Sequence, residues 1–170
     1  EKELNLAKNM EIIVNPFQIE INGRKILNKL YAELDQLSKS ELMYIKTLEL
    51  TGKIQEYLLE LEQHTEYVLE FDMELDMPAL FKSVGIQYEV QETDFFEQII
   101  RYIKIAVNVL ATKVFVFINL RSYLTDLQMQ ELIKEISYQD VKGLFIENHD
   151  RSCMEGGMRY IIDRDGCEIY

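Results

Sequence analysis

Four carboxylates recur at every second position near the middle of the chain, in residues 70–76, which we call the acidic segment. They are Glu70, Asp72, Glu74 and Asp76. An extended chain rises roughly 3.3 Å per residue and turns alternate side chains to opposite faces, so these acids would line one face about 6.6 Å apart. A basic partner would neutralise such an array, and so would hard divalent cations, which take several carboxylate oxygens at once. An exposed edge strand that uses acids to prevent pairing is the alternative interpretation.

The composition describes a globular but strongly acidic chain. Its 170 residues include 48% hydrophobic side chains, which is enough for a substantial core. It carries 30 Asp and Glu against 18 Lys and Arg, a formal net charge of -12. This balance argues against a general nucleic-acid-binding protein, because phosphate attracts positive surfaces. Binding to DNA therefore requires local basic patches, oligomerisation or bound cations.

Local basic patches occur on two predicted helices. Lys39, Lys46 and Lys53 recur every seven residues, which places them in a slowly drifting stripe along one helical face. Arg101 and Lys104 are neighbours on another helix. One interpretation is contact with phosphate in a groove or channel. The other is a set of solubilising side chains whose aliphatic stems cover apolar surface.

The sequence contains no recognisable catalytic motif. The phosphate-binding pattern GxxxxGK[ST] does not occur, and the apolar run VFVFIN ends in the neutral Asn119. His64 and His149 stand outside metal-site and nucleophile motifs, and Cys153 and Cys167 lack zinc-site spacing, which predicts reduced thiols. No apolar run is long enough to span a membrane, and nothing at the start resembles a signal peptide, so we expect a soluble, cytoplasmic protein.

The hydrophobic period predicts the elements that position these residues. In the first half, we expect strands at 11–14 and 17–22, a helix from Arg24, a second helix after Ser38 or Ser40, and a short helix after Pro78. In the second half, we expect a strand at 85–90, a helix capped by Thr93 or Asp94, a buried strand at 113–120, a helix from Thr125, a buried strand at 143–148 and two short strands within 159–170. Strands that alternate with helices indicate a mostly parallel α/β sheet. We therefore predict an α/β head from residues 1–23 and 65–170 and a projecting helical leg from 24–64.

Four stretches, in this order and spacing, resemble a known family. They are NPFQIEINGRKILNKLYAEL, VLEFDMELDMPALFKSVGIQYE, KVFVFINLRSYLT and GLFIENHDRSCMEGGMRYIIDRDGCEIY. Together they cover most of the chain and resemble the small spacer-acquisition proteins of type II-A CRISPR systems. The chain begins close to a predicted buried strand, so the resemblance leads us to expect that the family's opening residues precede it.

The resemblance implies properties that the residue patterns alone do not. Members of this family have an α/β head with the topology of P-loop NTPases but without their catalytic motifs. The resemblance implies a homotetrameric ring that encircles double-stranded DNA at free ends, stabilised by Ca2+ on Glu70, Asp72, Glu74 and Asp76. It implies a non-catalytic role in CRISPR adaptation, with the integrase proteins and the effector nuclease of the same locus as partners. Lys39, Lys46, Lys53, Arg101 and Lys104 are our own hypothesis for the DNA contacts.

Two other classes of function remain open at this point. A divalent-metal nuclease would use the acidic segment to hold two ions and would cleave DNA with magnesium or manganese. An acidic protein-interaction module would recruit a basic partner and would bind no DNA with or without calcium.

Overall fold

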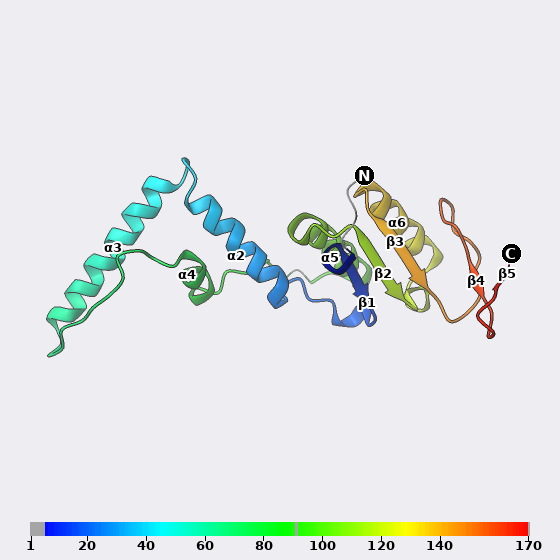
Figure 1. The fold of residues 1–170 in the computed structure, drawn as a ribbon, viewed down its shortest axis with the longest axis horizontal. Coiled ribbons are helices and arrows are strands. Elements are labelled where there is room, and N and C mark those ends of the chain that lie inside the picture. Colours follow the sequence, from blue (N-terminus) through cyan, green and yellow to red (C-terminus); the bar gives the residue numbers. More distant parts are fainter. Residues whose placement is uncertain (1–5, 91, 170) are drawn as a thin grey trace. The chain divides into compact units, whose positions relative to one another are not determined.

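A computed structural model describes residues 6–90 and 92–169 of the chain (Figure 1). The contacts divide the chain into two compact units. An α/β unit comprises residues 1–21 and 90–170, and a helical unit comprises residues 22–89. The helical unit is longer than the leg predicted at 24–64, because the acidic segment and the helix after it make their contacts there. Among the described residues, no helix is both long and apolar enough to cross a lipid bilayer.

Three parallel strands form the sheet of the α/β unit. They are β1 (Met10–Ile13), β2 (Val114–Ile118) and β3 (Lys142–Ile146), in the order β1-β2-β3. The register aligns Ile12 with Val116 and Val116 with Leu144. The predicted parallel sheet and its buried central strand are confirmed, since Phe115 and Phe117 of β2 are fully buried. The apolar run of β2 therefore lies at the centre of the sheet, with β1 and β3 on either side.

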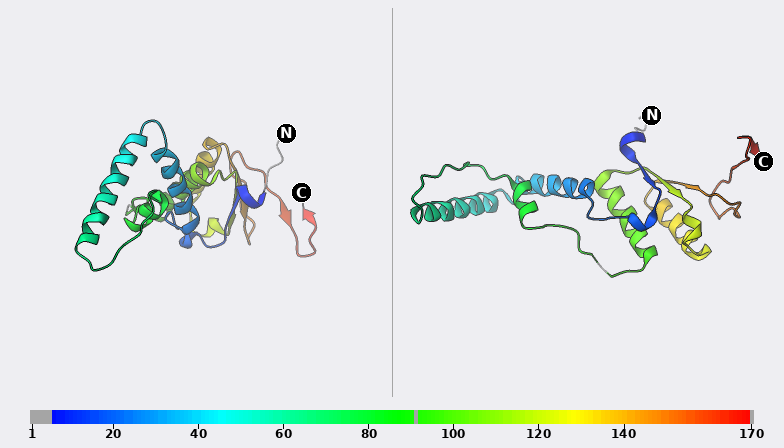
Figure 2. Two further views of the ribbon diagram at one scale, coloured as in Figure 1. Left: turned by 60° about the vertical axis from the view of Figure 1, so that its left-hand side comes forward. Right: turned by 90° about the horizontal axis from the view of Figure 1, so that it is seen from below.

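Two helices cover one face of this sheet, as Figures 1 and 2 show. They are α5 (Phe95–Leu110) and α6 (Asp126–Tyr138). A β-carbon added at Gly143 would lie 3.0 Å from Cδ1 of Ile136, so the face that carries Gly143 and its register partner Phe115 packs against α6. Ile99 and Ile103 of α5 are also fully buried. The core of this unit therefore lies between the two helices and a single face of the sheet.

The opposite face of the sheet carries apolar side chains that remain exposed at both edge strands. Ile12 of β1 is 54% exposed and Leu144 of β3 is 53% exposed, whereas Val116 between them is 7% exposed. The sequence predicted β3 as a buried strand, and this part of the prediction is wrong. Apolar strands usually signal cover on both faces of a parallel sheet, but here the described elements cover only one.

The predicted strand at 17–22 is also wrong. Residues Pro16–Gln18 form the 3-10 turn η1 instead. The side chain of Asn15 accepts a hydrogen bond from the backbone N–H of Phe17 at 3.1 Å, and the Pro16 ring restricts the backbone at the start of the turn. Local capping thus outweighs the alternating pattern that followed it.

Side-chain caps begin both long helices of the α/β unit. Of the two candidates before α5, it is Asp94 that accepts the N–H of Glu97 at 2.8 Å. Thr125 begins α6 in a capping box, in which Thr125 and Gln128 each satisfy a backbone N–H of the other. The predicted pair of strands near the end is confirmed as a hairpin of β4 (Ile161–Ile162) and β5 (Glu168–Ile169).

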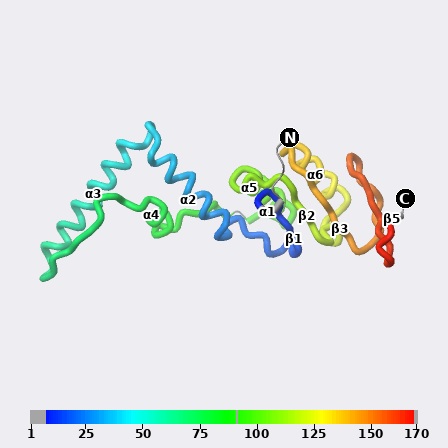
Figure 3. The backbone as a smooth tube through the Cα atoms, viewed as in Figure 1, coloured from blue at the N-terminus to red at the C-terminus, as the bar shows by residue number. Residues whose placement is uncertain are grey.

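The helical unit consists of three helices and their connections, which Figure 3 traces as a tube. They are α2 (Arg24–Ser38), α3 (Tyr44–Gln63) and α4 (Met77–Ser83). Helices α2 and α4 pack together, and each has one buried apolar side chain, Ile26 on α2 and Met77 on α4. Helix α3 buries none of its side chains. The two predicted leg helices and the short helix after Asp76 are therefore confirmed.

The predicted strand at 85–90 pairs with no strand in the described part of the chain, and it makes its contacts with Asn22 and α2. Asn22 donates from Nδ2 to the carbonyl of Tyr88 at 2.9 Å and accepts the N–H of Tyr88 at 2.8 Å. The hydroxyl of Tyr31 donates to the carbonyl of Ile86 at 2.8 Å. Side chains thus make the backbone hydrogen bonds that a neighbouring strand would otherwise make. The alternating pattern of 85–90 reflects a segment with one side against a helix.

Candidate functional site

The acidic segment is an irregular connection between α3 and α4, so the extended array predicted for its four acids does not form. Glu70, Asp72 and Glu74 are exposed to solvent, while Phe71 and Leu75 turn partly inward. Gln55 on α3 donates to the carbonyl of Met73 at 2.7 Å and holds the segment beside that helix. Phe71 and Leu75 are therefore partly buried and the acids project into solvent, while the Met73 side chain is 73% exposed.

Asp76 differs from the other three acids because it has a structural partner. Its carboxylate accepts the N–H of Ala79 at 3.0 Å and caps α4. Near this cap, Met77 is 7% exposed and Pro78 occupies the first helical turn. One oxygen of this carboxylate is therefore already engaged in the fold.

The donor chemistry of the acidic segment suits calcium, but its arrangement within one chain does not form a cage. Calcium takes six to eight oxygen ligands, usually from several carboxylates and carbonyls at once. Within residues 6–90 and 92–169, no three His, Cys, Asp or Glu side chains converge in a way that would hold a metal ion. The exposed acids of one chain thus offer individual ligands rather than a complete site.

The candidate DNA-binding residues fall into two sets on different units. Lys46 and Lys53 lie on α3 and are exposed, whereas Lys39 at the end of α2 pairs with Asp35 at 2.7 Å. Arg101 and Lys104 lie on α5 of the α/β unit, where Lys104 pairs with Glu135 at 3.5 Å. The predicted stripe of three lysines along one helical face is wrong, because α2 ends before Lys39 and only Lys46 and Lys53 share α3. The second set lies on the helix that contacts α6.

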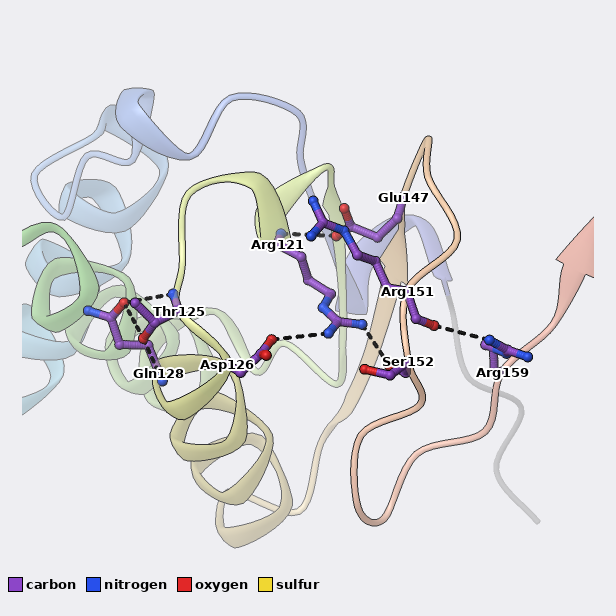
Figure 4. Close-up of polar contacts among 8 residues, drawn as sticks. All are labelled: Arg121, Thr125, Asp126, Gln128, Glu147, Arg151, Ser152 and Arg159. Atoms are coloured by element: carbon purple, nitrogen blue, oxygen red, sulfur yellow. Dashed lines mark hydrogen bonds and ion pairs between the residues drawn. The ribbon is translucent and has the colours of Figure 1, made fainter.

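A polar network that sequence reasoning did not find joins the segments after β2 and β3 (Figure 4). The backbone N–H of Arg121 donates to Glu147 at 3.1 Å, and its guanidinium contacts the carbonyl of Ser152 at 2.8 Å and the carboxylate of Asp126 at 3.3 Å. The side chain of Arg121 is only 10% exposed. Arg121 therefore fixes the loop after β3 to the start of α6.

Asn119 closes the same edge of the sheet. It adopts a left-handed conformation with φ at 53°, and its side-chain oxygen accepts the N–H of Asn148 at 3.0 Å. The Asn119 side chain makes no cap bond to the turn Leu120–Ser122 that follows it, and connects to the loop after β3 instead. One feature of the sequence could have indicated this polar network. Residues 147–152 directly follow a predicted parallel strand, and binding sites of α/β sheets often lie beyond the carboxyl ends of such strands. His149 in this segment is exposed.

The comparisons with known proteins identify the family. The family model described as CRISPR-associated protein (Cas_Csn2) matches residues 1–166. The chain belongs to the Csn2 family of CRISPR-associated proteins. It is similar to the CRISPR-associated protein Csn2 of Enterococcus faecalis, with 26% identity over 159 residues that cover 91% of this chain and 69% of the relative. The resemblance stated from the sequence is confirmed.

The family match includes the residues of both candidate sites. The match extends over both compact units, including the acidic segment and the lysines of α3. The Csn2 name connects the chain with CRISPR systems and assigns no role to a particular residue.

Proposed function

We propose that this Csn2 family member is a non-catalytic protein that binds double-stranded DNA at free ends and acts in CRISPR spacer acquisition as a calcium-stabilised homotetrameric ring. The observation that carries the proposal is the family-model match over residues 1–166. Its partners are the integrase proteins and the effector nuclease of the same locus. The parallel sheet is consistent with a relation to P-loop NTPases. The protein acts in the cytoplasm, where CRISPR arrays acquire spacers.

The surface of α3 supports assembly into an oligomer. This helix buries no residue, although it carries apolar side chains on several sides. Those that are at least 41% exposed are Tyr44, Ile45, Leu48, Leu50, Tyr57, Leu59 and Leu61. A monomer rarely leaves so much apolar surface in water, and burial against another chain returns roughly 25 cal/mol per Å² of apolar area.

The charge distribution is compatible with DNA binding if the basic side chains gather on one surface. A chain with a net charge of -12 repels phosphate over most of its surface. Lys46 and Lys53 are exposed on α3 and lie seven residues apart, so they present positive charge on one side of that helix. In a ring, only the inner wall must be positive, and contacts to phosphate carry no base sequence information.

We include calcium in the proposal because the acidic segment offers carboxylate oxygens, which calcium binds. Glu70, Asp72 and Glu74 are exposed carboxylates that are free to take ligand positions, but the described part of one chain gathers no three such groups. We therefore expect an isolated chain to bind calcium weakly. A tight site requires further oxygen ligands, supplied by rearrangement of the segment or by a neighbouring chain.

The experiment is to measure binding of a linear DNA duplex by the full chain with and without excess calcium, while light scattering after size exclusion follows the mass. We expect a tetramer that binds the linear duplex in calcium and leaves it uncut. We also expect it to bind a closed circular DNA poorly. A monomer that binds neither DNA in either condition would overturn the proposal. Cleavage with magnesium or manganese would favour the nuclease instead.

A further inference from the structure

Three aromatic side chains from separate segments meet at the carboxyl edge of the sheet in the α/β unit. We call Phe17, Phe95 and Tyr123 the aromatic cluster. The rings of Phe17 and Phe95 stack with centroids 4.5 Å apart, and Tyr123 stands nearly perpendicular to Phe17 at 5.0 Å. Phe17 follows β1 and Tyr123 follows β2, and because these strands are parallel both residues lie beyond the same edge. Ligands of open α/β sheets bind at this edge.

The aromatic cluster is a surface feature and not part of the core. Phe17 is 62% exposed and Tyr123 is 50% exposed, whereas Phe115 and Phe117 in the sheet are fully buried. Large aromatic side chains lose much of their favourable burial when they remain in water. Exposed aromatic rings that gather in one place therefore indicate a binding surface.

Local structure holds the exposed rings in place before any partner binds. The side chain of Asn15 caps the turn by accepting the N–H of Phe17, and Pro16 in the same turn is buried. Tyr123 stands close in the chain to Leu120 and Leu124, which are 1% and 8% exposed and anchor its backbone in the core. A surface that is already ordered loses little entropy on binding, so such a cluster is suited to recognition.

Exposed acids lie close in the chain to two rings of the aromatic cluster. Asp94 directly precedes Phe95 and is exposed, and the side chain of Asp126, close to Tyr123 in the chain, is 79% exposed. The basic Arg121 is only 10% exposed and already contacts Asp126. The faces of aromatic rings are also electronegative, so both features attract a cation and repel phosphate.

We propose that the aromatic cluster binds an arginine side chain presented by a basic segment of a partner protein. A guanidinium stacks on an aromatic ring and at the same time donates hydrogen bonds to a carboxylate. Because Oδ1 of Asp94 already accepts the N–H of Glu97, its other oxygen is the acceptor that Asp94 offers. A lysine ammonium has no planar face and makes fewer directed bonds. This inference does not rest on DNA binding, because the residues that carry it are not the candidate DNA contacts: Arg101 and Lys104 lie farther along α5, and Lys46 and Lys53 lie on α3.

The test measures fluorescence anisotropy of two labelled peptides with the full chain at physiological salt. One peptide alternates glycine with three arginines, and its twin replaces each arginine by lysine. The variants Phe17→Leu and Tyr123→Leu remove the rings, and Asp94→Asn removes a charge while an asparagine still caps α5. Tyr138→Leu is the matched control, because Tyr138 is 86% exposed in the last turn of α6.

We expect the arginine peptide to bind more tightly than the lysine peptide. Each ring variant weakens binding of the arginine peptide by roughly two- to five-fold, which corresponds to the contribution estimated for a cation–π pair at an exposed site. Asp94→Asn weakens it as well, and Tyr138→Leu does not. Equal affinity for both peptides, no binding of either peptide, or equal loss in the control variant would overturn the proposal. Binding of a single-stranded oligothymidine that depends on Tyr123 would also overturn it, because the cluster would then stack bases.

Discussion

The carboxylate of Asp76 accepts a hydrogen bond from the backbone N–H of Ala79 at 3.0 Å, so this acid begins α4. The other three acids of the segment, Glu70, Asp72 and Glu74, project into solvent. Four carboxylates at regular spacing in the sequence therefore have two different environments. One contributes to folding, and three are available to a cation or to a partner.

Asp76→Ala should lower the free energy of unfolding by about 1 kcal/mol, the usual cost of a lost N-cap. Asp76→Asn should cost less, because asparagine caps a helix as well as aspartate does and only the favourable interaction with the helix dipole is lost. Chemical denaturation followed by circular dichroism measures both. If Asp76→Asn destabilised the protein as much as Asp76→Ala, the capping role would be wrong.

A second pair of variants separates capping from calcium binding. Calcium titration by calorimetry compares Asp76→Asn with Asp72→Asn, which changes an exposed acid without a cap. We expect Asp72→Asn to reduce calcium binding by the assembled protein more than Asp76→Asn, because one oxygen of Asp76 is already engaged. Unchanged binding in both variants would remove the acidic segment from the calcium proposal.

Lys46→Gln and Lys53→Gln should each reduce the salt dependence of DNA binding. Loss of one phosphate contact changes the slope of log affinity against log salt by about 0.9 for duplex DNA. Lys39→Gln should have a smaller effect, because Lys39 already pairs with Asp35 at 2.7 Å. Lys134→Gln on α6 is the control. A slope that none of the α3 variants changes would place the DNA contacts elsewhere.

Tyr102 should make the α/β unit unstable at high pH. Burial, together with the charge and hydrogen bond of Glu11, raises the pKa of Tyr102 above its ordinary value of 10.0. The folded protein keeps the phenol neutral where the unfolded chain ionises it, so the unfolded state binds fewer protons and stability falls as pH rises above about 10. Below that pH this contribution is fully present.

Denaturation at a series of pH values checks this prediction. Tyr102→Phe should flatten the loss of stability above pH 10, while Tyr123→Phe, which changes a half-exposed ring, should leave it unchanged. An identical alkaline profile for Tyr102→Phe and the unaltered protein would contradict the assignment. The neutral-pH stability of Tyr102→Phe also reports the net contribution of the hydrogen bond to Glu11, typically about 1 kcal/mol.

Gly143→Val should destabilise the α/β unit by about 1–3 kcal/mol, the usual cost of overpacking a core. An added β-carbon would meet Cδ1 of Ile136 at 3.0 Å and the ring of Phe145 at 3.2 Å. In an Ile136→Val background, which removes that Cδ1 atom, Gly143→Val should cost less. A double-mutant cycle of unfolding free energies measures this coupling. Simple additivity of the two changes would mean that α6 does not restrict position 143.

The sequence alone determined the elements whose signals are local. Asp94 and Thr125 begin helices because their side chains bond to the backbone a few residues ahead, and such bonds need no distant partner. The period of the apolar residues predicted α2, α3, α5 and α6, and the unbroken apolar run of β2 predicted a central strand. The family could be identified from sequence for a similar reason, because the order of its motifs is carried by the chain itself.

Tertiary structure decided which neighbours each apolar or charged side chain meets. The alternation in 17–22 and 85–90 indicated one buried side, but a capped turn and the start of α2 supply it in place of a strand. The run in β3 indicated burial, yet the strand lies at an edge whose outer face the described elements leave exposed. Hydrophobic patterning reports which side chains favour burial and not what buries them.

The same distinction applies to the candidate sites. The sequence alone showed that four residues of this segment carry carboxylates. Only the fold showed that Asp76 caps a helix while Glu70 projects into solvent. The meeting of Phe17, Phe95 and Tyr123 had no signal in the sequence, because their segments are distant in the chain. Parallel strands bring their carboxyl ends to one edge, and this long-range geometry placed the three rings together.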